Sequence, residues 1–261
     1  MTVAGKGNPL VAGFVALVYG FMYVPVLVVL MFSLNDSEIF AFPLQGFTLR
    51  WFHEVLTDPR LIGGFGVTLS VAIPVSCLAS VLGALAALAL TRYGMRFKTV
   101  FLVLLLVPFL IPKAILALSQ LILLSELGIE RTLLTLIAAQ TIIILPFTAL
   151  VIASVLIRID PRLEEAAADL GASPFSCFKR VTLPLMRNGI MAAFFIAFVL
   201  SSSEYVLTSL VSGRSQPLSV LVASDFRFAI SPTLDALAVL IVIGNIALVG
   251  VGELFRKRSG Q

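Results

Sequence analysis

Six long apolar runs alternate with shorter polar segments along this chain. The runs cover residues 11–34, 64–90, 100–124, 133–157, 190–211 and 234–255. A helix rises 1.5 Å per residue, so about 20 apolar residues cross the hydrocarbon of a bilayer. The pattern predicts an all-α integral membrane protein with six transmembrane helices, forming a single domain over residues 1–261. The first run is too long for a cleaved signal peptide, so we expect it to be retained.

Prolines and small residues occur within the apolar runs but do not change the predicted number of transmembrane helices. Several runs contain a proline, which neighbouring helices tolerate when the freed backbone groups find partners or face a cavity; these are Pro74, Pro108, Pro112 and Pro146. The second run is rich in small residues, among them Ala79, Gly83 and Ala87. Such residues predict a surface that another helix can approach closely.

Composition and charge agree with a membrane protein and indicate its orientation. Hydrophobic residues make up 59% of the chain and charged residues 12%, more apolar surface than a soluble interior can hide. The net charge of +4 does not indicate a nucleic-acid partner, because the lysines and arginines flank the apolar runs. With the N-terminus in the cytoplasm, inside segments hold twelve lysines and arginines and outside segments five. This asymmetry predicts cytoplasmic N- and C-termini and a cytoplasmic segment at 158–188.

The segment after the first run contains a short amphipathic pattern at residues 48–57. Its apolar face is formed by Leu49, Phe52, Val55 and Leu56, which predicts a helix lying on the outer membrane surface. Trp51 fits an anchor at the membrane interface. His53 is the only histidine and has no partner ligands nearby, so we expect a solvated side chain and no metal site.

The longest polar interruption, residues 157–189, contains two helix signals. Asp160 can cap a first helix, Pro161 suits its first position, and Gly171 can end it in the left-handed conformation. Ser173 and Pro174 repeat the start signal, and Pro184 predicts the end of the second helix. Taken alone, the segment is also compatible with an ordinary cytoplasmic helical hairpin.

A spacing pattern distinguishes this segment from an ordinary hairpin. Glu165-Ala166-Ala167, then Gly171, then Val181-x-Leu183-Pro184 resembles the EAA loop of bacterial ABC-importer permeases, which usually carry isoleucine where Val181 stands. Beyond the loop, Ser33–Ser37, Gly46–Phe52, Leu207–Gly213 and Ser231–Leu237 look like the spermidine/putrescine-type permeases. The resemblance covers nearly the whole chain.

This resemblance implies a fold, a location and a set of partners. The fold would be the type I importer transmembrane domain in the bacterial inner membrane. Two such subunits, often two different chains, would sit on a cytoplasmic ABC ATPase dimer and receive substrate from an extracytoplasmic binding protein. The helix of the EAA loop would be the coupling helix seated in the ATPase. The residues implied in coupling are Glu164, Glu165, Ala166, Ala167, Ala168, Asp169, Gly171, Leu183 and Pro184.

The chain lacks the motifs of an enzyme that uses ATP. No G-x-x-x-x-G-K-[ST] phosphate loop occurs, so we expect no bound cofactor here and ATP hydrolysis on a separate chain. An intramembrane enzyme would need a paired catalytic set, and the serines beside Glu204 have no intramembrane histidine. A secondary carrier is the less favoured alternative, because the two halves show no convincing internal repeat.

Two ionisable residues within the apolar runs carry the question of substrate. Lys113 and Glu204 each cost roughly 2.5–3.5 kcal/mol at a helix centre, so both should face protein or water. Either they pair only to hold the bundle together, or they line the pathway, or they reach an interface. The pathway hypothesis comprises Lys113, Ser202, Ser203, Glu204 and Tyr205.

The sequence departs from the polyamine-type permeases at these positions. That family carries an acidic residue where Lys113 stands and two aspartates where Glu204 and Tyr205 stand. A polycation gains from carboxylates along its pathway and loses from an ammonium group. The import of a zwitterion or anion, such as an amino-acid derivative, opine or phosphonate, is therefore the alternative to polyamine import.

Overall fold

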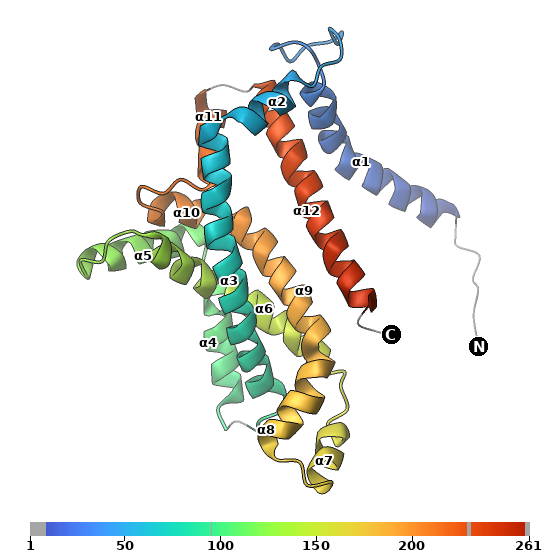
Figure 1. Ribbon diagram of the computed structural model, residues 1–261, viewed down its shortest axis with the longest axis vertical. Helices are drawn as coiled ribbons and strands as arrows, with labels where there is room; N and C mark the ends of the chain where they lie inside the picture. The colour runs from blue at the N-terminus through green and yellow to red at the C-terminus, as the bar shows by residue number, and fades with distance from the viewer. Residues whose placement is uncertain (1–8, 95, 229–230, 259–261) are drawn as a thin grey trace. The chain divides into compact units, whose positions relative to one another are not determined.

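The computed structural model describes residues 9–94, 96–228 and 231–258, and these ranges are almost entirely helical (Figure 1). In chain order the helices are α1 (Pro9–Ser33), α2 (Arg50–Thr57), α3 (Pro59–Thr91), α4 (Lys98–Leu110), α5 (Lys113–Glu126), α6 (Leu133–Leu156), α7 (Arg162–Asp169), α8 (Pro174–Cys177), the π-helical η1 (Phe178–Thr182), α9 (Leu183–Ser202), α10 (Val206–Val211), α11 (Leu218–Phe228) and α12 (Pro232–Arg258). Within the described ranges no strand forms, only an isolated bridge between Asn35 and Phe47. The all-α prediction is confirmed.

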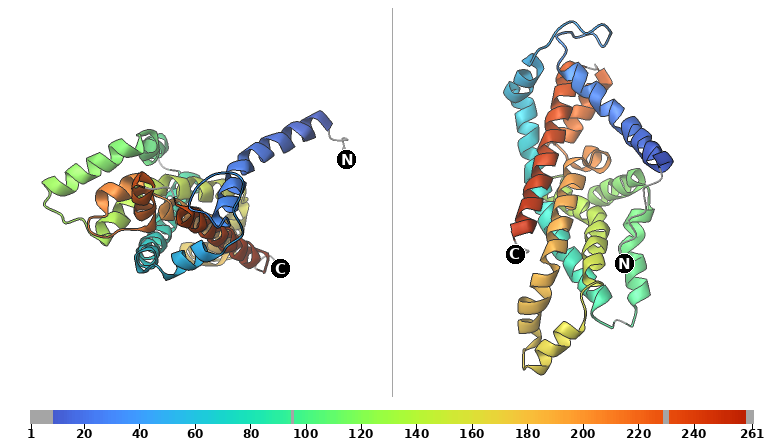
Figure 2. Two further views of the ribbon diagram at one scale, coloured as in Figure 1. Left: turned by 90° about the horizontal axis from the view of Figure 1, so that it is seen from above. Right: turned by 90° about the vertical axis from the view of Figure 1, so that its right-hand side faces the viewer.

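The chain divides into two compact units. Unit 1 comprises residues 1–62 and 225–244, and unit 2 comprises residues 63–224 and 245–261. Unit 2 contains α4 to α10 and most of α3. Within it, α7 and α8 lie together at one end, apart from α5 and α10 (Figures 1 and 2).

Several helices match the predicted membrane spans. α1, α3 and α6 are each long and apolar enough to cross a membrane, as predicted for the first, second and fourth runs. The continuous helix from Pro174 to Ser202 is a fourth, and the bent pair α4–α5 counts as a fifth if taken as one span. α12 covers the sixth predicted run, with an apolar stretch at Pro232–Ala247. In the part of the chain described, six complete spans therefore stay a prediction.

The third run forms two helices rather than one, with the break beside one of the prolines that the sequence places in it. α4 ends at Leu110, α5 begins at Lys113, and the two helices meet at 98°. The cause is local: Pro112 disfavours the helical conformation in the residue before it, and Ile111 has an extended ψ of 132°. The break places Lys113 at the start of a new helix rather than within a straight one.

The prediction that Pro184 ends a helix is also wrong. α8, η1 and α9 continue as one 29-residue helix that ends at Ser202. The wider π-turn over Phe178–Thr182 lets a new α-helical segment begin at Leu183, so Pro184 stands in a first turn, where its missing N–H is not needed. The fifth predicted run, 190–211, accordingly begins inside this helix and contains the separate α10.

Helix α6 occupies the core of unit 2. Its buried residues contribute to two apolar clusters, one with Val75 of α3 and Leu207 of α10, the other with Met186 of α9. α3 approaches α6 closely at Gly83, where a β-carbon would overlap the Thr148 hydroxyl and lie 2.9 Å from the amide nitrogen of Ala149. The Thr148 hydroxyl donates to the Ala79 carbonyl at 2.7 Å. The small-residue surface predicted on the second run is therefore confirmed.

Replacing Gly83 with alanine is expected to destabilise the protein by about 1–3 kcal/mol, the usual effect of overpacking a close helix contact. Gly66→Ala is the matched control on the same helix, because nothing lies within 4 Å of its added β-carbon. The control is expected to be neutral or stabilising by up to about 1 kcal/mol, the helix propensity gained over glycine. Thermal unfolding of the two variants in detergent measures the difference, and equal midpoints would contradict the close packing.

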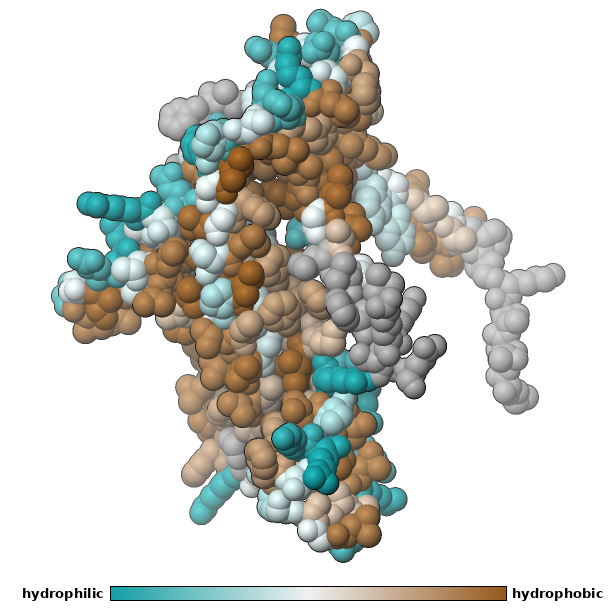
Figure 3. Space-filling model, in the orientation of Figure 1, coloured by the Kyte–Doolittle hydropathy of each residue, from teal (hydrophilic) through white to brown (hydrophobic). Residues whose placement is uncertain are grey.

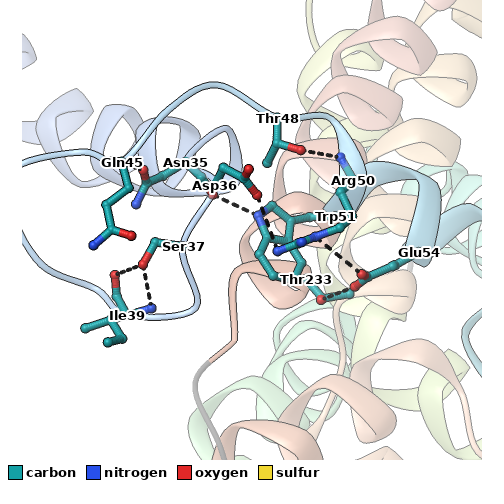
Figure 4. A network of polar contacts seen from close by, with 10 residues as sticks. All are labelled: Asn35, Asp36, Ser37, Ile39, Gln45, Thr48, Arg50, Trp51, Glu54 and Thr233. Carbon is teal, nitrogen blue, oxygen red and sulfur yellow. Dashed lines mark hydrogen bonds and ion pairs between the residues drawn. The ribbon is translucent and has the colours of Figure 1, made fainter.

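The prediction for Trp51 in unit 1 needs correction. α2 forms over the predicted segment, but Trp51 and Val55 are its buried residues, while Leu49 and Leu56 are exposed. The indole N–H of Trp51 donates to the Asn35 carbonyl at 2.9 Å, and the Arg50 guanidinium covers the ring at 4.3 Å (Figure 4). Because both the polar edge and the face of the indole are satisfied by protein, Trp51 is a packing residue here and not an interfacial anchor. His53 is exposed, as predicted.

Candidate functional site

Both ends of α7 are closed by residues that the sequence predicted to cap it. The Asp160 carboxylate accepts the N–H of Arg162 at 3.0 Å, and Pro161 precedes the first residue of α7. At the other end Gly171 has φ +85°, with the amides of Gly171 and Ala172 donating to the carbonyls of Ala168 (2.9 Å) and Ala167 (3.0 Å). This paired closure is a Schellman motif, which requires a left-handed residue. The sequence therefore predicted the C-terminal end of α7 correctly and its start to within one residue, because Pro161 is the N-cap and not the first helical residue.

The outer face of α7 is apolar and exposed. Leu163, Ala166 and Leu170 are spaced to share one side of the helix, and Leu170 is 90% exposed. Phe175 of α8 adds a ring that is 72% exposed. Figure 3 shows hydrophobic residues among polar ones over α7 and α8, whereas the surface over α3 is mainly hydrophobic. Leu163, Leu170 and Phe175 were not among the residues predicted for coupling, although the seven-residue spacing of Leu163 and Leu170 is that of one helix face.

The other predicted coupling residues are distributed over two places. Glu165, Ala168 and Asp169 are exposed on α7, and Ala167 is half-buried. Leu183 and Pro184 are exposed in the first turn of α9 and do not belong to α7.

Glu164 differs from its neighbours because it pairs with a residue at the end of α3. Its carboxylate pairs with Arg92, the residue after α3, with Nε to Oε1 at 2.9 Å. The same guanidinium donates from Nη2 to the Ile159 carbonyl at 2.9 Å. Arg92 is only 10% exposed, so its charge depends on these partners. In the sequence, Arg92 indicated only the membrane topology, and nothing there predicted its pair with Glu164.

Lys113 and Glu204 meet in unit 2, at the breaks of two helices. Lys113 opens α5 after the 98° bend, and Glu204 stands between α9 and α10. The Lys113 Nζ lies 2.6 Å from the Glu204 Oε2. The lysine side chain is 53% exposed and the glutamate 7% exposed, so the pair has a buried anion and an accessible cation. The Oε1 of Glu204 accepts the amide of Leu207 at 3.3 Å.

A buried polar network lies in the same unit and joins α6 to the two helices that flank Glu204, α9 and α10. The Ser201 hydroxyl donates to the Gln140 side-chain oxygen, and the Gln140 amide donates to the Thr208 hydroxyl at 2.9 Å. These three residues come from α9, α6 and α10 and are buried. Sequence reasoning missed Gln140, whose signal was a lone amide in a long apolar run.

The remaining residues predicted to line the pathway are Ser202, Ser203 and Tyr205. Ser202 and Ser203 both donate to the Val199 carbonyl of their own helix, at 3.1 and 2.7 Å. Tyr205 is half-buried at the start of α10. Across the described ranges, no group of three or more histidine, cysteine or acidic residues could hold a metal ion.

Comparison with known proteins identifies similar sequences over most of the chain. Residues 79–260 match the family described as binding-protein-dependent transport system inner membrane component. The spermidine/putrescine transport system permease protein PotC of Escherichia coli (strain K12) is 31% identical over 252 residues, covering 96% of this chain and 95% of that protein. The putrescine transport system permease protein PotI of the same strain is 34% identical over 240 residues, covering 89% and 85%.

Two further comparisons bear on substrate and fold. PhnV of Salmonella typhimurium (strain LT2), named as a candidate 2-aminoethylphosphonate transport system permease protein, is 31% identical over 252 residues, covering 92% of this chain and 91% of PhnV. A chain in the crystal structure of the bacterial alginate ABC transporter, in complex with an alginate pentasaccharide-bound periplasmic protein, has a TM-score of 0.74. That chain is 17% identical, with coverage of 95% of this chain and 94% of the other, and so supports the fold.

Proposed function

This chain belongs to the family of binding-protein-dependent transport system inner membrane components, and from that membership we propose how it couples to ATP and what it carries. As a permease of an ABC importer it is a transport component of the bacterial inner membrane rather than an enzyme. The proposal is that it forms half of a translocation pathway, paired with a second and different permease chain. An extracytoplasmic binding protein delivers the substrate, and a cytoplasmic ATPase dimer supplies the energy.

One observation supports the ATPase contact above all others. α7 is a short helix closed at both ends, with an apolar face of Leu163, Ala166 and Leu170 that no described part of unit 2 covers. Such a face in water is costly unless a partner covers it. The small side chains of Ala166 and Ala168 allow a close fit, and the exposed Glu165 can pair with a basic group of the partner. Closure of the ATPase pair would then displace α7.

The pathway is proposed to run past Lys113 and Glu204. Ionisable groups inside a membrane protein face the bundle interior or a water-filled cavity, and these two lie at helix breaks, where the backbone is also polar. The exposed Lys113 ammonium would meet the passing solute, with Ser202, Ser203 and Tyr205 on the neighbouring segment. The buried Glu204 holds the lysine in place.

The substrate proposed first is a polyamine, the class named for PotC and PotI. The Glu204 carboxylate neutralises Lys113 within the pair, so the pair need not repel a polycation. A zwitterion with an anionic group, as named for PhnV, is the second candidate. It is favoured by the accessible Lys113 ammonium, which could donate to a carboxylate or phosphonate.

Reconstitution with the binding protein, the second permease and the ATPase in proteoliposomes tests these candidates. We expect the spermidine-loaded binding protein to stimulate ATP hydrolysis and uptake, whereas a binding protein loaded with an aminoalkylphosphonate should not. Stimulation by the phosphonate alone would replace the first candidate with the second. If the ATPase does not bind the purified permease at all, the proposed coupling through α7 fails.

A further inference from the structure

Arg92 joins the end of a long core helix to the proposed coupling helix. Its guanidinium contacts α7 through Glu164 and the preceding segment through the Ile159 carbonyl, each at 2.9 Å. Two different nitrogens make these contacts, so one planar group braces both the first turn of α7 and the chain that leads into it. The thiol of Cys177 adds a weaker contact to the Glu164 carbonyl at 3.7 Å.

From these contacts of Arg92 with Glu164 and Ile159 we infer that Arg92 is a positioning residue that transmits displacement of α7 to α3 during transport. The inference rests on the proposed function of α7 as the ATPase contact and identifies the link behind it. Arg92 itself is 10% exposed and Glu164 24% exposed, so water competes only weakly for either charge. The outer face of α7, with Leu170, stays available to the ATPase. Glu164 therefore makes a contact within the permease, whereas Glu165 is available for a contact with the ATPase.

α3 is suited to carry the motion further. It contacts α6 closely at Gly83, and its residues Val71, Val75 and Ala79 belong to the apolar cluster of unit 2. The same cluster contains Ala117 of α5 and Leu207 of α10. These are the two helices beside which Lys113 and Glu204 pair. A displacement of α3 is thus applied directly to the packing around the proposed pathway.

The test compares variants of Arg92 and Glu164 in the complete reconstituted transporter. Arg92→Gln and Glu164→Gln each remove one charge; the second keeps the shape of the side chain, whereas the first also shortens it. Both should co-purify with the ATPase and still hydrolyse ATP, but transport per ATP hydrolysed should fall about tenfold, as for the loss of a charge-assisted hydrogen bond. Arg92→Lys should fall between, because an ammonium cannot brace both contacts at once. The double glutamine variant should be no worse than either single one.

Arg96→Gln is the matched control, because it removes the same charge from an exposed position four residues away. It should transport normally. Unchanged transport per ATP in both glutamine variants overturns the inference. Loss of ATPase binding in Glu164→Gln alone also overturns it, since Glu164 would then face the ATPase directly.

Two further outcomes concern a variant that fails to assemble and a failure of the proposed function itself. If Arg92→Gln fails to assemble, the isosteric Glu164→Gln decides by the same measure of transport per ATP. Failure of the proposed function has a different signature: the ATPase would still bind a variant in which Leu170 on the outer face of α7 is charged. A merely structural role of Arg92 would not lower transport per ATP while ATPase binding is retained. Nor would it give a partial recovery of transport per ATP in Arg92→Lys.

Discussion

Replacing Leu170 with glutamate is expected to weaken capture of the ATPase by the detergent-solubilised permease and to reduce uptake with it. Leu170 is 90% exposed at the end of α7, so the substitution should change the free energy of unfolding by less than about 0.5 kcal/mol. Its effect at an interface is larger, because a charge placed in an apolar contact must be desolvated without a partner. We expect affinity for the ATPase to fall at least about tenfold, as for a central interface residue.

The control is Leu170→Met, which keeps the apolar contact and should bind the ATPase as the unaltered chain does. Co-purification of the ATPase measures binding, and thermal unfolding of the permease confirms that the fold is intact. A Leu170→Glu variant that binds the ATPase and transports normally would show that the apolar face of α7 is not the contact surface.

Replacing Glu204 with glutamine is expected to reduce uptake at least about tenfold while leaving ATPase binding intact. Glutamine keeps the volume and an acceptor for the Leu207 amide, but it removes the charge that holds the Lys113 ammonium at 2.6 Å. The loss of stability should be modest, about 1 kcal/mol, because water around the half-exposed lysine replaces part of the lost interaction. Uptake should suffer more, since the ammonium would no longer be held or neutralised in the pathway.

A double variant separates transport from structure. Lys113→Met combined with Glu204→Gln removes both charges and so leaves neither one unpaired, a replacement that is often neutral or stabilising even for buried pairs. If the pair lines the pathway, the double variant recovers its thermal stability but still transports poorly, and this is the expected result. Recovery of uptake together with stability would instead make the pair a structural tie, the alternative that the sequence left open.

Local signals in the sequence were reliable where the structure depends on neighbouring residues. The start and end of α7 follow from Asp160, Pro161 and Gly171, because caps and left-handed turns are decided within one helical turn. The same holds for α1, α3 and α6, whose apolar length is a property of the run itself. Proline was the exception, because its effect depends on context: Pro112 breaks a span, whereas Pro184 stands inside a continuous helix beside a π-turn.

The sequence by itself determined that this chain is helical and membrane-embedded, and its EAA-like spacing indicated the importer family before any comparison. Only the tertiary structure decided which charges meet. Arg92 and Glu164 are 72 residues apart and Lys113 and Glu204 are 91 apart, and no periodicity links such positions. Partners at that separation are selected by the packing of α3, α5, α7 and α9, because a charge removed from water pairs with whatever group the fold brings within reach. Tertiary structure likewise buried Trp51 in unit 1 and left Leu170 of unit 2 in solvent, although both are large and apolar.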